Sequence, residues 1–259
     1  MTSSPETRSP ETDVDRPDPR PKVVLVTGAS SGIGEATARR LGAEGHHVVL
    51  GARRQERTEV VAEEIRAAGG SAEARNLDVT DRRAFQAVVD RTVEERGRLD
   101  VLVSNAGLMP LSPLDALLVD EWDRMIDVNV RGLLHGIAAA LPVFQRQGGG
   151  HVVTIASIGA HEVAPTAAVY CATKYAAWAI TEGLRLEVDP SIRVTTVSPG
   201  VVESELAGTI TDPAAQEAMR TYRADSIPPD AIARAVSFAL AQPADVDVNE
   251  MIIRPARQR

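Results

Sequence analysis

The sequence is poor in aromatic residues, cysteine and long apolar runs. Aromatic side chains make up 3% of its 259 residues, so we expect a core built from Val, Leu, Ile and Ala. The single cysteine, Cys171, excludes an internal disulfide and suits a small buried apolar position better than a nucleophile. No apolar run reaches the ~18 residues that span a bilayer, and the N-terminus lacks the apolar segment of a secretory signal. These absences predict a soluble, cytoplasmic protein with no membrane contact.

Composition and charge narrow the class of protein further. The chain is 44% hydrophobic and 25% charged, which is typical of a globular protein, and its length fits one large domain. A formal net charge of −8 argues against a nucleic-acid binder, which usually carries a basic face. Residues 1–21 are polar and charged with almost no apolar content, so we expect a disordered tail before a domain at residues 22–259.

Strand-like and helix-like patterns alternate along that domain. Patterns that predict strands, several of them apolar runs typical of buried strands, cover Lys22–Thr27, His47–Gly51, Ser71–Leu77, Leu99–Ser104, His151–Ala156, Ile192–Val197 and Glu250–Arg254. Helical patterns cover Glu35–Gly45, Arg54–Ala68, Asp81–Arg96, Glu121–Gln147, Ala167–Val188 and Pro229–Ala241. The alternation predicts an α/β fold, a doubly wound parallel sheet of about seven strands with helices on both faces.

Two stretches depart from this regular pattern. Pro142 interrupts the predicted helix Glu121–Gln147, so we expect a kink or an early end there. Residues Val201–Ser226 are less periodic, and we expect them to form a loop and short helices outside the sheet.

A glycine-rich turn lies between the first predicted strand and the first predicted helix. In Gly28-Ala-Ser-Ser-Gly32-Ile-Gly34, the glycines let the backbone turn tightly and approach a pyrophosphate, which the N-terminus of the helix then faces. The same pattern by itself also fits a purely structural turn. Its position between strand and helix favours a dinucleotide site.

The end of the second predicted strand indicates which dinucleotide binds. NAD sites commonly carry an acidic residue there, whereas this chain has Gly51-Ala52-Arg53-Arg54. An arginine suits the 2′-phosphate of NADP, and the hydroxyls of Ser30 and Ser31 lie in the neighbouring turn. Solvated arginines at a helix start are the alternative, but there they would oppose the helix dipole.

Further polar and small residues follow the third and fourth predicted strands. Asp78 is placed either to accept a hydrogen bond from an adenine amino group or to cap the next helix. Asn105-Ala-Gly107 offers small residues on which a cofactor can lie. Because ligands of such folds bind at the carboxyl ends of the strands, these positions belong to the same predicted site.

Three chemically active side chains follow the predicted strand His151–Ala156. Ser157 ends that strand, and Tyr170 and Lys174 lie four residues apart on the next helix, so they share one face. A neighbouring ammonium favours the phenolate, and we expect it to lower the pKa of Tyr170 from about 10. A lowered pKa suits a proton donor or acceptor. The same spacing also occurs on ordinary helices, where such side chains are simply solvated.

Together these motifs resemble the short-chain dehydrogenase/reductase family over Lys22–Arg254. The matching pieces are Thr27-Gly-Ala-Ser-Ser-Gly-Ile-Gly34, Leu77-Asp78, Asn105-Ala-Gly107, Asn129, Ser157, Tyr170-x-x-x-Lys174 and Pro199-Gly200. The segment Asn249–Pro255 is further similar to an NADP-dependent branch that includes clavulanate dehydrogenase and bacterial 3-hydroxy acid and serine dehydrogenases. The chain departs from the family at Ser104, where Asn is usual, and at the acidic residues Glu203 and Glu205 beside Ser204.

The resemblance implies a single Rossmann-type domain and a role for each matching residue. Tyr170 would be the general acid in reduction or the general base in oxidation. Lys174 would lower its pKa and hold the nicotinamide ribose, and Ser157 would orient the substrate carbonyl. Asn129 would anchor a water that links Lys174 to solvent. No metal ligand is implied. The expected cofactor-binding residues are Gly28, Ser30, Ser31, Gly32, Ile33, Gly34, Arg53, Arg54, Asp78, Val79, Asn105, Ala106, Gly107, Tyr170, Lys174, Pro199, Gly200, Val202 and Ser204.

The substrate side of the predicted site is formed by segments that follow the fourth, fifth and sixth strands. They are mostly apolar, which suits a small ketone, aldehyde or alcohol. His161 and Glu162 are candidates for a polar contact or are exposed loop residues, and Arg220 and Arg223 would bind a carboxylate if residues Val201–Ser226 fold over the site.

We therefore expect an NADP(H)-dependent oxidoreductase that transfers hydride between nicotinamide and a ketone, aldehyde or secondary alcohol. An NAD-linked alcohol dehydrogenase of the same fold and a non-catalytic cofactor-binding protein are the alternatives. The resemblance also implies a homodimer or homotetramer.

Overall fold

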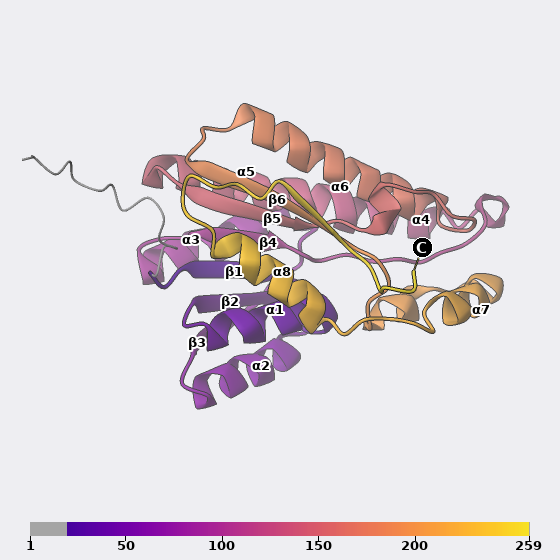
Figure 1. The fold of residues 1–259 in the computed structure, drawn as a ribbon, viewed down its shortest axis with the longest axis horizontal. Helices are drawn as coiled ribbons and strands as arrows, with labels where there is room; N and C mark the ends of the chain where they lie inside the picture. Colours follow the sequence, from indigo (N-terminus) through magenta and orange to yellow (C-terminus); the bar gives the residue numbers. More distant parts are fainter. Residues whose placement is uncertain (1–19, 259) are drawn as a thin grey trace, which may run out of the picture.

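The computed structural model describes residues 20–258 as a single domain, so the predicted disordered tail lies outside this range except for its last two residues. One parallel sheet runs through the domain in the order β3-β2-β1-β4-β5-β6-β7 (Figure 1). Its strands are β1 (Val23–Thr27), β2 (His47–Ala52), β3 (Ser71–Asn76), β4 (Val101–Ser104), β5 (Gly150–Ile155), β6 (Ile192–Pro199) and β7 (Glu250–Ile253). The predicted α/β fold with a doubly wound parallel sheet is confirmed.

Helices cover both faces of this sheet (Figure 1). One face carries α1 (Gly32–Ala43), α2 (Gln55–Ala67) and α8 (Asp230–Leu240), and the other carries α3 (Arg82–Arg96), α5 (Gly132–Gln147) and α6 (Ala168–Glu187). Beyond one end of the strands lie α4 (Val119–Ile126) and α7 (Pro213–Tyr222). Short helical turns complete the fold: η1 (Leu114–Ala116), η2 (Asp127–Arg131), η3 (Ile158–Ala160) and η4 (Glu205–Thr209).

The sheet is the centre of two apolar clusters, one on each face. On the first face, Leu41 of α1 and Ile232 of α8 pack against strand residues such as Val24. On the second, Phe85 of α3 and Phe144 of α5 pack against strand residues such as Leu102. Full burial of each such side chain contributes about 1.5–3 kcal/mol to the stability of the fold. Strands rich in aliphatic residues can therefore form a stable core although aromatic residues are few.

Local sequence fixes the ends of several helices. The side chain of Asp81 accepts hydrogen bonds from the backbone N–H groups of Arg83 and Ala84, which starts α3, and Gly97 ends it with φ +75°. Asp212 caps α7 in the same way, with Pro213 in its first turn. The predicted loop and short helices at Val201–Ser226 correspond to η4 and α7.

The predicted single helix Glu121–Gln147 is wrong in one respect. It consists of α4, the π-helical turn η2 and α5, which follow one another without leaving the helical region of backbone conformation. It does not end early at Pro142, because α5 continues to Gln147. Pro142 lies on the exposed side, while Val143 and Phe144 next to it are buried and hold the last turn against the core.

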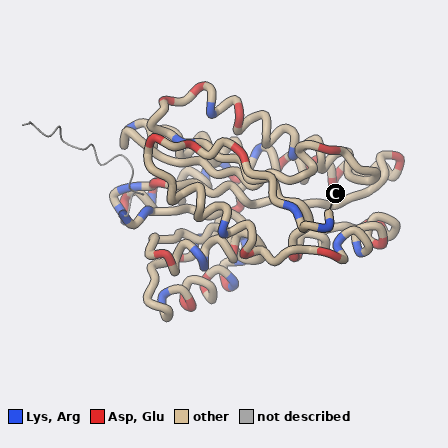
Figure 2. The backbone as a smooth tube through the Cα atoms, in the orientation of Figure 1, with Lys and Arg blue, Asp and Glu red and all other residues tan. Residues whose placement is uncertain are grey.

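The strand order places the functional end of the sheet. The order in which successive strands are added to the sheet reverses between β1 and β4, and a ligand crevice forms at the carboxyl ends of the strands at such a point. Acidic and basic residues are interspersed along the backbone around the fold (Figure 2). None of the helices within residues 20–258 combines the length and apolar content needed to cross a bilayer.

Candidate functional site

The glycine-rich turn packs tightly against the end of β4. Gly28 has φ +65°, and a Cβ atom on it would lie 2.9 Å from the Cα of Ala106. A Cβ on Gly34 would lie 2.4 Å from the carbonyl oxygen of Gly28. The Asn105 amide donates to the carbonyl oxygens of Thr27 and Gly28, at 2.9 and 3.3 Å. The turn therefore brings bare backbone to the crevice, as the close approach of a pyrophosphate requires.

The first turn of α1 is open toward the same crevice. Its N-cap residue, Ser31, makes no capping hydrogen bond with its side chain, and Ser31, Gly32 and Ile33 line the crevice. Helix N-terminal N–H groups carry partial positive charge, so this arrangement fits a pyrophosphate.

Arginine side chains border the crevice beyond β2. Arg54 donates to the hydroxyl oxygens of Ser30 and Ser31, both at 2.9 Å. Arg53 is exposed and lines the crevice, and β2 ends at Ala52 with no carboxylate. The two arginines and two serines predicted from sequence are thus together.

Asp78 also lies in this part of the crevice. Its carboxylate accepts from the backbone N–H and the hydroxyl of Thr80, so the alternative role as the cap of the next helix is wrong, because Asp81 is the cap. Burial acts to raise the pKa of Asp78, but the Thr80 hydrogen bonds and the charge of Arg53 outweigh it, and the pKa is lowered.

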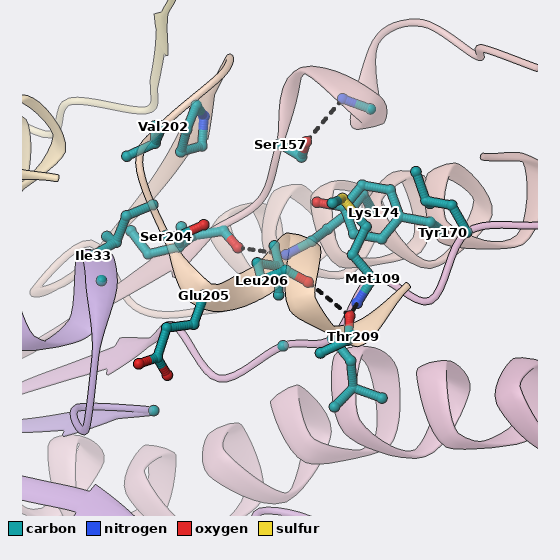
Figure 3. Close-up of a pocket in the computed structure, with 18 of the residues that line it drawn as sticks. Ile33, Met109, Ser157, Tyr170, Lys174, Val202, Ser204, Glu205, Leu206 and Thr209 are labelled. Carbon is teal, nitrogen blue, oxygen red and sulfur yellow. Dashed lines mark hydrogen bonds between the residues drawn. The ribbon is translucent and has the colours of Figure 1, made fainter. Parts of the chain in front are cut away.

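Ser157, Tyr170 and Lys174 meet at the opposite end of the crevice (Figure 3). Ser157 follows β5 and accepts from the backbone N–H of Gly159 at 3.0 Å. Tyr170 and Lys174 lie one turn apart on α6, and the Lys174 nitrogen is 6.0 Å from the centre of the Tyr170 ring. That nitrogen donates to the carbonyl oxygen of Ile155 at 3.0 Å. The three side chains predicted from the sequence are therefore brought together.

Burial controls the pKa values of this group. It raises the pKa of Tyr170 to about 12, with a hydrogen bond from Ser157 acting in the opposite direction. It lowers the pKa of Lys174 to about 8. The lowered tyrosine pKa expected from the sequence is therefore not found in this structure. The reason is that both groups are removed from water, which disfavours the charged form of each.

Asn129 lies in the π-helical turn η2 behind these residues. Its amide oxygen accepts from the backbone N–H of Leu108, and its amide nitrogen donates to the Leu108 carbonyl oxygen and to the hydroxyl of Thr173. Both donor hydrogens of the side chain are thus used within the protein. Asn129 ties the segment after β4 to α6, beside the Lys174 side chain.

One continuous cavity of about 920 Å³ joins the two ends of the crevice. It is lined by all the catalytic and cofactor-binding residues predicted from sequence except Asn129, which is 5% exposed, and Gly34, which packs against Gly28. Within residues 20–258, no group of His, Cys, Asp and Glu side chains is arranged to hold a metal ion. Glycine turn, arginine pair and Ser–Tyr–Lys group therefore share one long cavity.

The family model for short chain dehydrogenases matches residues 22–215. The chain belongs to the short-chain dehydrogenase/reductase family. An uncharacterized oxidoreductase of Staphylococcus saprophyticus is 46% identical over 240 residues, which cover 92% of this chain and 97% of the relative. This short-chain dehydrogenase is thus an oxidoreductase whose fold binds a nicotinamide cofactor.

Solved structures of family members superpose closely on it. An alcohol dehydrogenase from Thermococcus sibiricus, complexed with 5-hydroxy-NADP, has a TM-score of 0.83 at 33% identity and covers 93% of this chain and 99% of its own. The closed form of a serine dehydrogenase complexed with NADP+ has a TM-score of 0.82 at 32% identity, covering 89% and 93%. A 3-ketoacyl-(acyl-carrier-protein) reductase from Brucella melitensis, complexed with NADH, has a TM-score of 0.81 at 30% identity, covering 93% and 100%.

The substrate side of the short-chain dehydrogenase is closed by the segment after β6. Helix α7 contributes Met219 and Tyr222 to the cavity lining. Arg223 follows it and donates to the carbonyl oxygens of Val202 and Ser204, while Arg220 pairs with Glu217 outside the cavity. The segment thus folds over the site, but the Arg223 guanidinium already has backbone partners.

The two residues after β5 that were candidates for a polar substrate contact, His161 and Glu162, differ in their position relative to the cavity. Glu162 lines the cavity, whereas His161 does not. The His161 ring turns to the Ser198 hydroxyl at 3.0 Å and to the Glu250 carboxylate at 3.1 Å. Cys171 is buried, as expected, although it too borders the cavity.

Sequence reasoning missed three residues of this site. Arg57 pairs with the cavity residue Glu205 and lies three residues after Arg54, the N-cap of α2, a spacing that would have indicated a shared face. The Thr209 hydroxyl accepts from the backbone N–H of Met109 at 3.1 Å and so joins η4 to the segment after β4 (Figure 3). No sequence signal marks Thr209 or Tyr222, because their positions depend on how η4 and α7 fold back.

Proposed function

We propose that the protein is an NADP(H)-dependent carbonyl reductase that also works in reverse as an alcohol dehydrogenase. The observation that carries this proposal is the single cavity that has Arg54 with its serine partners at one end and Ser157, Tyr170 and Lys174 at the other. A dinucleotide in extended form reaches both ends. The bound cofactor supplies the hydride chemistry, and the chain supplies binding, orientation and the proton.

Tyr170 is assigned the proton transfer to the carbonyl oxygen. With a pKa raised to about 12, its phenol is protonated at neutral pH, which suits the donor in a reduction. The Ser157 hydroxyl is placed beside it to hold the carbonyl oxygen. Lys174 is largely protonated below a pKa of about 8 and is placed to bind the nicotinamide ribose.

NADP is proposed over NAD because of the residues around the adenosine end. Arg53 and Arg54 stand with Ser30 and Ser31 where a 2′-phosphate would bind, and Ala52 offers no carboxylate to a 2′-hydroxyl. The NADP complexes of similar structures support this assignment. The NADH complex of another keeps the NAD-linked enzyme as the alternative.

Tyr170→Phe tests the chemical step. We expect turnover of NADPH with a panel of small ketones and aldehydes to fall about 100-fold or more, since general acid catalysis typically contributes that much. NADPH binding, followed by fluorescence titration, should be retained in the variant. Unchanged turnover on every substrate that the wild type reduces would refute the role of Tyr170.

Arg54→Ala and Arg53→Ala test the cofactor assignment. We expect tight NADPH binding by the wild type, a loss of about tenfold or more in either variant, and little change in NADH binding. Equal binding of both cofactors, untouched by the substitutions, would instead assign the arginines to the surface and favour the NAD-linked alternative.

A further inference from the structure

The segment after β6 crosses the cavity at the start of α1. A Cβ atom on Gly32 would lie 3.3 Å from the Cβ of Ser204, so this segment passes directly over the glycine-rich turn. Glu205 follows Ser204 and begins η4. Its carboxylate points away from Tyr170 and Lys174 (Figure 3).

That carboxylate bridges two arginines of the neighbouring wall. One oxygen lies 2.7 Å from a terminal nitrogen of Arg54, and the other lies 2.7 Å from a terminal nitrogen of Arg57. These two arginines hold the pKa of Glu205 down at about 2, so the carboxylate is ionised at any working pH. An anion therefore already lies between the guanidinium groups.

The contacts of Arg54 are divided between two sides. Its Nε and Nη2 atoms donate to Ser30 and Ser31, and its Nη1 atom donates to Glu205. A phosphate that approaches Arg54 from the cavity meets a guanidinium in which each of the three nitrogens already donates a hydrogen bond. Glu205 occupies the Nη1 atom of Arg54, and a phosphate oxygen at that atom would take the place of the carboxylate, so the two anions compete there.

We propose that Glu205 is a specificity-determining residue whose carboxylate competes with the 2′-phosphate of the cofactor for Arg54 and Arg57. This proposal rests on the proposed function, which places the 2′-phosphate at Arg54. The competition weakens binding of NADP and leaves binding of NAD unaffected. It therefore reduces the preference of the enzyme for NADP over NAD.

Adenosine 2′,5′-bisphosphate and adenosine 5′-monophosphate are the probes, because they differ at the 2′-phosphate and carry no nicotinamide. In calorimetric titrations of the full chain, Glu205→Gln should bind the bisphosphate about two- to tenfold more tightly than the wild type, as expected for the loss of two exposed ion pairs. Binding of the monophosphate should not change.

Glu203→Gln is the matched control, since it removes the same charge two residues earlier on the same segment. Glu203 makes no ion pair to Arg54 or Arg57 in the described part of the chain. An equal gain in affinity for the bisphosphate in the Glu203 and Glu205 variants would show that the change in net charge alone causes the effect, and would overturn the proposal. Unchanged or weaker bisphosphate binding in Glu205→Gln would also overturn it.

Arg54→Ala separates this proposal from the function on which it rests. If that substitution leaves the ratio of the two affinities unchanged, the 2′-phosphate does not bind at Arg54 and the NADP assignment fails. If the ratio collapses while Glu205→Gln has no effect, the assignment stands and the competition is wrong. In a double variant with Arg54→Ala and Arg57→Ala, the further substitution Glu205→Gln should not increase the affinity for the bisphosphate.

Discussion

Lys174 and Tyr170 show how strongly burial acts on single residues in this site. Both side chains are largely removed from water, the lysine at 7% and the tyrosine at 8% exposure. Burial shifts the pKa of the lysine down and that of the tyrosine up, so both favour their neutral forms. The pair is therefore poised with a protonated phenol and an ammonium that is readily deprotonated.

The lowered pKa of Lys174 predicts a pH dependence of stability. An unfolded lysine titrates near ~10.4, so between pH 8 and that value the unfolded chain binds more protons, and stability rises with pH. Relative to Lys174→Met, the wild-type free energy of unfolding should increase by about 2–3 kcal/mol between pH 8 and about pH 10. Urea denaturation at a series of pH values measures this difference.

Tyr170 sets the upper limit of that pH window. Its pKa is raised to about 12 from an unfolded value near ~10, so its contribution is constant below the unfolded value and is lost as pH rises further. The rise assigned to Lys174 should therefore persist in a Tyr170→Phe background below about pH 10. If the free energy of unfolding changed with pH in the same way in the wild type and in Lys174→Met, the assignment of this rise to Lys174 would be contradicted.

The sequence predicted which residues of the reaction group come together but not their ionisation. The four-residue spacing of Tyr170 and Lys174 places them on one face of the helix. Ser157 follows a predicted strand, which places its side chain at the carboxyl end of the sheet, close to that face. Spacing does not reveal how deeply that face is buried. The sign of the tyrosine shift was therefore wrong, although the residues were correctly grouped.

At the scale of elements, the turn from β1 to α1 depends on Gly34 for space. Gly34→Ala places a Cβ 2.5 Å from the Asn105 amide and closer still to backbone, so the turn must shift. We expect a loss of about 1–3 kcal/mol in unfolding free energy and weakened NADPH binding. Urea denaturation and cofactor titration measure the two effects.

Gly183→Ala is the matched control for that substitution. Gly183 lies within α6 with no atom within 4 Å of a Cβ placed on it. Alanine there should stabilise the protein by about 0.5–1 kcal/mol and leave NADPH binding unchanged. A Gly34→Ala protein as stable as the wild type would show that the turn does not need this glycine.

The elements themselves were largely predictable, and the exceptions have physical causes. Strand and helix patterns differ in period, so each predicted strand has a counterpart in the sheet. The π-helical turn η2 could not be predicted, because the residue it buries is the polar Asn129 and no apolar pattern marks the turn. Pro142 did not end α5, because an exposed proline leaves only a solvent-facing carbonyl without its partner.

At the scale of the whole molecule, alternation along the chain predicted the parallel sheet and the end at which the site lies. What sequence could not predict is the contact between distant segments. Glu205 and Arg54 are 151 residues apart and meet only because η4 folds back over the first turn of α1. The homodimer or homotetramer stays a prediction.

The π-helical turn also governs how the gene tolerates changes in length. A turn of this kind holds one residue more than an α-helical turn, so the segment Asp127–Arg131 already accommodates one extra residue. Deleting one residue here would close the wide turn to an α-helical one and leave α4 in nearly the same orientation. A further inserted residue would instead rotate everything before it by about 100° relative to α5. Buried Met125 of α4 would then face a different direction. A single-codon insertion should therefore be far less tolerated here than at exposed Gly148, whereas a single-codon deletion within the turn should be tolerated.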